Sequence, residues 1–166
     1  MHGLFILTFI ANVALSLVSL LFLPSRVAVH FRIGGAADNW ASSYFNTFFF
    51  IGINTFLFLL FYYTPRLIFR LPAKWSNLPN KGYWLRPENR PLTAERVSSF
   101  MYQFGSALFL LLLVVQLLAV QANLSHPVKF NEKLFLTALV LFVLYTAHWC
   151  IRFFKAFRLP KGLQTP

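Results

Sequence analysis

His30 and Asp38 stand eight residues apart in a polar stretch between two long apolar runs. An imidazole beside a carboxylate can orient a tautomer, sense pH or help to hold a metal ion. Two ligands are too few for a defined metal site, so we predict none. With Gly34, Gly35 and Trp40 they form a candidate site for a ligand or a partner. In the structural alternative, Asp38 caps a turn while His30 packs near Trp40 and hydrogen-bonds to backbone.

Polar side chains inside the apolar runs form a second group of candidates. Asn12 and Asn54 lie in the first two runs, and Tyr145 and His148 share one helical face of the last. Polar residues at this depth face a bundle interior or a cavity. We expect His148 to make an inter-helix hydrogen bond; a haem held by His148 and His2 is the alternative. The first run also carries a polar and small stripe, expected to pack helices or receive a larger partner: Thr8, Asn12, Ser16 and Ser19.

The sequence contains no motif that is typical of covalent or acid–base catalysis. Cys150 is the single cysteine, so neither an internal disulfide nor a multi-cysteine metal site is expected. Glycine-rich phosphate loops, nucleophile elbows and metalloprotease helices are absent. Glu88 and Glu95 have no evident second carboxylate. We predict a protein that is not an enzyme and carries no cofactor.

Four apolar runs must position these residues. Of the chain's residues, 58% are hydrophobic and 11% charged, with a mean hydropathy of +0.62. The runs 3–23, 44–63, 97–120 and 134–151 contain no Asp, Glu, Lys or Arg, and about 20 such residues cross a bilayer. We predict an all-α polytopic membrane protein, a single four-helix bundle over 1–166 with helices at about 3–23, 44–63, 94–120 and 134–154. The first run is expected to be a retained anchor; a cleaved signal peptide is the alternative.

The net charge of +11 is distributed between the apolar runs, which indicates topology rather than nucleic-acid binding. Segment 64–96 and the tail from 152 hold eleven Lys and Arg, including Lys161, against four in the other two loops. Cytoplasmic loops are the ones enriched in Lys and Arg. We therefore expect an inner (plasma) membrane protein with both termini, the loop 64–93 and the tail 155–166 in the cytoplasm, and the loop 24–43 outside.

The loop 64–93 is expected to lie on the inner membrane surface rather than to form a nucleotide or protein site. Its aromatic residues, Trp75, Tyr83 and Trp84, suit the headgroup layer. Four prolines exclude one long helix there, and Thr93 is expected to cap the next helix. Six cations are candidates for binding anionic lipids: Arg66, Arg70, Lys74, Lys81, Arg86 and Arg90.

The outer segment resembles the signature of a family of small bacterial membrane proteins carrying the domain of unknown function 1648. In that family a helix ends at Leu-Pro, and a Val-His-Phe stretch, a Gly, and an Asp near an aromatic residue follow. The matching positions are Leu23, Pro24, Val29, His30, Phe31, Gly34 or Gly35, Asp38, Trp40 and Ser43. Residues 78–90 look like the inter-helix segment of longer members.

This resemblance implies a bacterial inner-membrane location. The best-known relatives are multi-span proteins that confer immunity to a secreted toxin and relay its presence to a transcriptional repressor. That role resides in larger members with an additional membrane domain, for which this chain is too short.

Three functions follow from the sequence. The first is a non-catalytic membrane protein, either an accessory subunit of a larger complex or a small envelope sensor or immunity factor. The second is a small transporter or channel component, which would need a polar path built from Asn, Gln, Thr and His148. The third is a haem-binding redox subunit.

Overall fold

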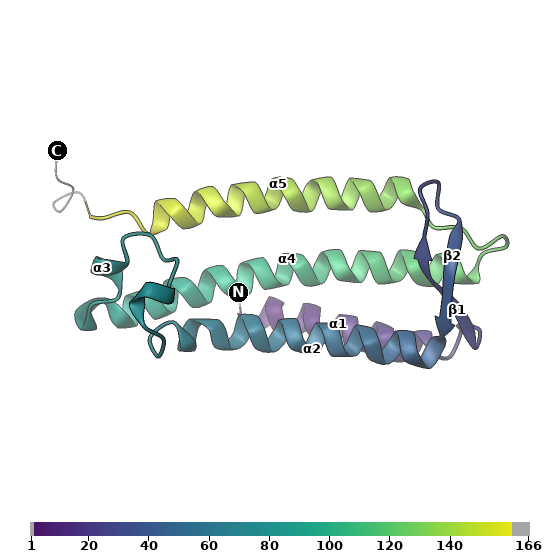
Figure 1. Ribbon diagram of the computed structural model, residues 1–166, viewed down its shortest axis with the longest axis horizontal. Coiled ribbons are helices and arrows are strands. Elements are labelled where there is room, and N and C mark those ends of the chain that lie inside the picture. Colours follow the sequence, from purple (N-terminus) through teal and green to yellow (C-terminus); the bar gives the residue numbers. More distant parts are fainter. Residues whose placement is uncertain (1, 161–166) are drawn as a thin grey trace.

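The computed structural model describes residues 2–160 and consists of four long helices lying side by side, with a β-hairpin across one end (Figure 1). The helices are α1 (His2–Ser19), α2 (Ser43–Leu67), α4 (Arg90–Leu124) and α5 (Glu132–Ala156). All four are long and apolar enough to cross a membrane. The predicted all-α, four-helix membrane bundle is confirmed, and the chain is a multi-pass membrane protein. The end of the predicted tail, with Lys161, lies outside the described residues.

The segment expected to be a loop at 24–43 contains an antiparallel hairpin of β1 (Arg26–Phe31) and β2 (Ala37–Ser42). Val27, Val29 and Phe31 favour extended backbone. Gly34 and Gly35 take positive φ angles of 92° and 81° between the strands, and this turn reverses the chain. The strands cross the bundle end at a steep angle to the helices (Figure 1).

The helix ends differ from the prediction at several points. α1 ends at Ser19, and short turns continue it to Leu23, where Pro24 follows. Pro65 lies inside the last turn of α2, which continues to Leu67. Thr93 is not a cap, because α4 already begins at Arg90; the Thr93 hydroxyl instead donates to the Trp84 carbonyl at 2.7 Å.

α1, α2 and α4 form the tightly packed part of the bundle. Phe5, Phe61 and Phe109 are buried between them, and Gly105 of α4 lies against the Phe5 ring. The predicted packing stripe is confirmed, since four of the five buried residues of α1 are its members: Thr8, Asn12, Ser16 and Ser19. Small and polar residues let helices approach closely and bond to one another in lipid.

The loop between α2 and α4 folds into a packed cap at one end of the bundle. It contains η1 (Ala73–Trp75), α3 (Lys81–Trp84) and η2 (Pro87–Asn89). Trp84, expected in the headgroup layer, is only 3% exposed, and its Nε1 donates to the Phe157 carbonyl at 2.8 Å. Arg96 donates to the Ala156 carbonyl at 2.7 Å. The cap therefore satisfies carbonyls at the C-terminal end of α5, where helices leave acceptors free.

α5 stands apart from α1 and α2 and packs mainly on α4 (Figure 1). None of its residues is buried. Trp149 and Phe153 pack against Phe100, and the Trp149 Nε1 donates to the Phe100 carbonyl at 3.0 Å. These contacts hold the half of α5 nearest the cap.

Candidate functional site: the hairpin

The hairpin brings His30 and Asp38 together, as the sequence predicted, and adds Arg32. The His30 Nδ1 lies 2.5 Å from the Asp38 Oδ1, and the Arg32 Nε donates to the Asp38 Oδ2 at 3.3 Å. Phe31 pairs with Ala37 and His30 with Asn39, so Asp38 is an extra residue on β2. Such a bulge redirects a side chain. We call His30, Arg32 and Asp38 the polar triad.

The triad is open to ligands. The side chains of His30 and Asp38 are 66% and 20% exposed. The hydrogen bond from His30 is the main cause that lowers the pKa of Asp38 below its usual value of 3.8, with burial opposing and Arg32 adding to the effect. Asp38 is thus a carboxylate with a donor on each oxygen. The site combines fixed negative charge with exposed nitrogen donors, which suits recognition of a charged or polar group.

The turn of the hairpin is attached to the beginning of α5. The Gly34 N–H donates to the Glu132 Oε2 at 2.7 Å, and the Phe130 N–H donates to the Gly35 carbonyl at 2.8 Å. A Cβ on Gly35 would collide with the Phe130 carbonyl, whereas one on Gly34 would meet open space. Beside this fixed turn, Ile33 is 96% exposed. An apolar side chain is therefore presented at the tip of a braced hairpin.

The base of the hairpin is attached to α4. The Asn123 side chain accepts from the Ala28 N–H at 2.6 Å and donates to the Ala28 carbonyl at 3.0 Å. Val27 and Ala28 are buried there. Sequence reasoning missed the roles of Asn123 and Glu132, although two signals were present. One is an amide at the end of an apolar run, and the other is one of only four acidic residues in the chain.

Trp40 does not join the triad. Its backbone N–H donates to the Asn39 Oδ1 at 2.8 Å, and its side chain is half-exposed. Within residues 2–160 its ring makes no aromatic contact with His30. Beneath the hairpin a cavity of about 330 Å³ separates it from α2, α4 and α5, with His30, Phe50 and Leu136 among its lining residues.

Of the four polar candidates inside the apolar helices, two lie in the buried part of the bundle and two lie on α5. Asn12 is buried and donates to the Phe109 carbonyl at 2.8 Å, and buried Asn54 donates to the Phe50 carbonyl at 2.8 Å. The Tyr145 hydroxyl donates to the Gln103 carbonyl at 3.3 Å. The expected inter-helix hydrogen bond of His148 is wrong: its side chain is exposed on α5, because Tyr145 and Trp149 occupy the face toward α4.

Three buried side-chain oxygens have no hydrogen-bond donor among the described residues: Asn12 Oδ1, Asn54 Oδ1 and Gln116 Oε1. Gln116 donates to the Ser16 Oγ at 2.6 Å, and the Thr47 hydroxyl reaches the Ser16 carbonyl at 3.5 Å. A polar seam therefore runs through α1, α2 and α4. Gln116 was not among the residues singled out from the sequence.

The six predicted lipid-binding cations all lie at the bundle end opposite the hairpin, and all are exposed: Arg66, Arg70, Lys74, Lys81, Arg86 and Arg90. In the described part of the chain, no three His, Cys, Asp or Glu side chains gather as metal ligands would.

Comparison with known proteins gives one match. Residues 7–55 match the family model described as a domain of unknown function, DUF1648. The matched region covers most of α1, the hairpin and the first half of α2, and therefore the whole polar triad; residues 78–90 are not in it. No curated protein and no solved structure matches the chain. Residues 7–55 of this four-helix membrane protein are thus similar to the domain of unknown function 1648.

Proposed function

We propose that this is a non-catalytic inner-membrane protein whose outer hairpin recognises a ligand or partner, as an accessory subunit or a small envelope sensor. The observation that carries the proposal is the braced hairpin. Ile33 and the polar triad are exposed together on a turn that hydrogen bonds attach to α4 and α5. Pre-organised exposed groups lose little entropy on binding.

The proposed orientation places the hairpin outside and both termini in the cytoplasm of a bacterial cell. The support is the charge asymmetry, since the six exposed cations and Arg96 lie at the cap end. Their proposed partners are anionic lipids of the inner leaflet. The unburied face of α5 supports an accessory role, because the apolar side chains Leu141, Leu144 and Ile151 remain free for lipid or another subunit.

A photo-crosslinking residue at position 33 tests the proposal in cells. A partner recognised by the hairpin gives a discrete adduct that disappears with His30→Ala or Asp38→Asn. The matched control carries the crosslinker at His126, which is exposed on the same side outside the hairpin. Equal adducts from positions 33 and 126, insensitive to both substitutions, would reject the hairpin as a recognition site.

A transporter or channel component is the second candidate, and the polar seam favours it. The unpaired oxygens of Asn12, Asn54 and Gln116 could each accept from a passing solute or water. Flux into liposomes that falls with Asn12→Leu and Asn54→Leu would support this function. Absence of flux across a panel of ions and small solutes would reject it.

A further inference from the structure

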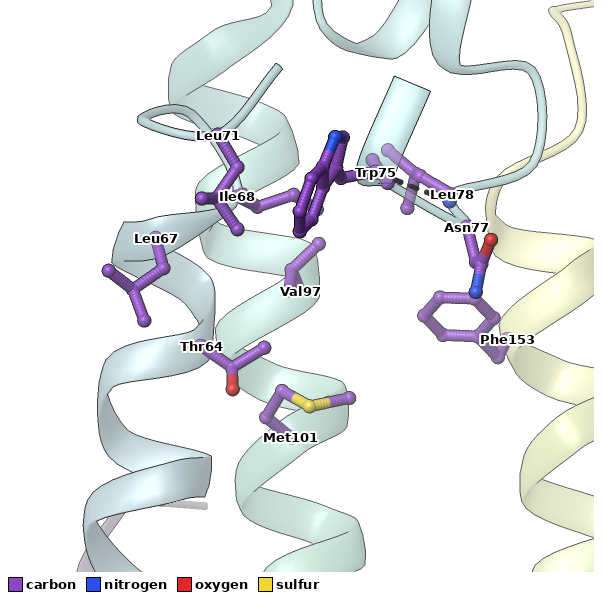
Figure 2. A pocket seen from close by; sticks show the side chains of 11 residues that line it. Thr64, Leu67, Ile68, Leu71, Trp75, Asn77, Leu78, Val97, Met101 and Phe153 are labelled. Atoms are coloured by element: carbon purple, nitrogen blue, oxygen red, sulfur yellow. Dashed lines mark hydrogen bonds between the residues drawn. The ribbon is translucent and has the colours of Figure 1, made fainter. Parts of the chain in front are cut away.

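A cavity of about 350 Å³ opens at the cap end of the bundle, between α2 and α5 (Figure 2). Val97 and Met101 of α4 form its floor, and Phe153 of α5 lies on the opposite side from Ile68, which directly follows α2. Segment 75–78 closes it above. The volume lies within the range of small-molecule sites, about 300–1,000 Å³.

The lining of this cavity is mostly apolar and suits a hydrocarbon chain. Most lining side chains are apolar, and two of the three polar ones are bonded within the chain: the Thr64 hydroxyl donates to the Leu60 carbonyl at 2.6 Å, and the Ser76 hydroxyl accepts from the Leu78 N–H at 3.3 Å. The third, Asn77, has no side-chain hydrogen bond within residues 2–160. Trp75 lies over the opening and is 71% exposed. An aromatic at the edge of an apolar slot is typical of the membrane interface.

Three cationic residues adjoin residues that line the cavity. Arg70 precedes the lining residue Leu71, and Lys74 precedes Trp75. The Lys81 Nζ donates to the carbonyl of the lining residue Ser76 at 3.3 Å. The side chains of Arg70 and Lys74 have no hydrogen bond or ion pair within residues 2–160. Residues 67–81 contain no acid, so no carboxylate next to these cations in the sequence neutralises them.

The volume of the cavity decides between occupants. An α-helix is about 10–12 Å wide with its side chains and rises about 5.4 Å per turn, so a single turn of helix is larger than the cavity of about 350 Å³. A soluble anion would satisfy the cations and leave the apolar walls uncovered. We infer that the cavity takes one acyl chain of an anionic phospholipid, with its phosphate held by Arg70, Lys74 and Lys81. The inference rests on the proposed function only in placing this end at the inner leaflet.

Quenching of Trp75 fluorescence by brominated acyl chains tests the site on the purified full-length chain. Vesicles of phosphatidylcholine receive a minor fraction of brominated phosphatidylglycerol or, in parallel, of brominated phosphatidylcholine. The Trp75 signal is taken as the difference from Trp75→Phe. We expect phosphatidylglycerol to be preferred by about tenfold or more, and Arg70→Gln/Lys74→Gln to remove that preference. The charge-matched control Lys155→Gln/Arg158→Gln, at exposed positions of the same end that are not among the six lipid-binding candidates, keeps it.

A second arm tests the acyl slot itself. Thr64→Phe fills the cavity and should abolish the selective quenching, whereas Ala107→Phe, which adds bulk in the separate groove between α4 and α5, should not. Equal quenching by the two lipids, equal loss with the Lys155/Arg158 control, or release of the lipid by inorganic phosphate alone would overturn the inference. If Thr64→Phe fails to fold, the charge variants decide. None of these readouts involves the hairpin, so a failure here and a failure of the crosslinking experiment are distinguishable.

Discussion

The side-chain amide of Asn123 bonds to both backbone groups of Ala28, donating to the carbonyl at 3.0 Å and accepting from the N–H at 2.6 Å. The two residues lie at the C-terminal end of α4 and near the start of β1. This pair joins the hairpin to the bundle, and it makes the triad part of a rigid body instead of a loose loop.

Asn123→Ala should therefore loosen the hairpin. Two bonds at a buried site are lost, and leaving such groups unsatisfied costs about 1–3 kcal/mol. We expect a lower Tm in detergent and faster amide hydrogen exchange at Ala28. Gln121→Ala, at an exposed position two residues earlier, should change neither. Unaltered exchange at Ala28 in the Asn123 variant would contradict the attachment.

Gly35→Ala should be more damaging than Gly34→Ala. Both positions have positive φ, which costs an L-residue about 1–2 kcal/mol. Only at Gly35 does the new methyl also meet the Phe130 carbonyl, so the turn must separate from α5. Thermal unfolding of the two variants compares them directly, and equal Tm losses would argue against the Gly35–Phe130 contact.

The triad should make the hairpin sensitive to acid. The folded-state pKa of Asp38 is lowered by His30 and Arg32, so its stabilising contribution is complete above its ordinary value of 3.8 and is lost as pH falls through the lower folded value. Between pH 5 and 7 the carboxylate stays ionised. Asp38→Asn should flatten the acid limb of a Tm-against-pH curve. A limb of unchanged slope would assign the acid sensitivity to other groups.

Gly105 controls the approach of α1 to α4. A Cβ there would lie 2.6 Å from the fully buried Phe5 ring, so Gly105→Ala should destabilise the bundle by about 1–3 kcal/mol through overpacking. Gly52→Ala is the matched control, because nothing lies within 4 Å of its Cβ. That substitution should be neutral or slightly stabilising, since alanine favours helix. Chemical denaturation in mixed micelles measures both.

The outer and inner ends can be distinguished with a single cysteine. In a Cys150→Ser background, Ile33→Cys should react with a membrane-impermeant maleimide on intact cells, and Lys74→Cys only after the cells are opened. Both positions are exposed on the protein, so access depends on the side of the membrane. The reverse labelling pattern would invert the proposed topology.

The sequence by itself determined the number of helices, their class and the residues of the packing stripe. Four uncharged runs of sufficient length admit few alternatives in lipid, because the backbone must bond within each segment. The pairing of His30 with Asp38 was also predictable, since a glycine turn between them limits their separation. These features depend on local composition and spacing.

Only the tertiary structure decided what the hairpin rests on, where Trp84 lies and which way His148 faces. Asn123 and Ala28 are 95 residues apart in the chain, so no local pattern relates them. Trp84 was expected at the membrane interface because aromatic residues suit the headgroup layer. In the structure it is buried in the cap, where its Nε1 donates to the Phe157 carbonyl. His148 lies on the exposed side of α5 because Tyr145 and Trp149 hold the face toward α4. Such choices are made by long-range packing, which composition and spacing do not specify.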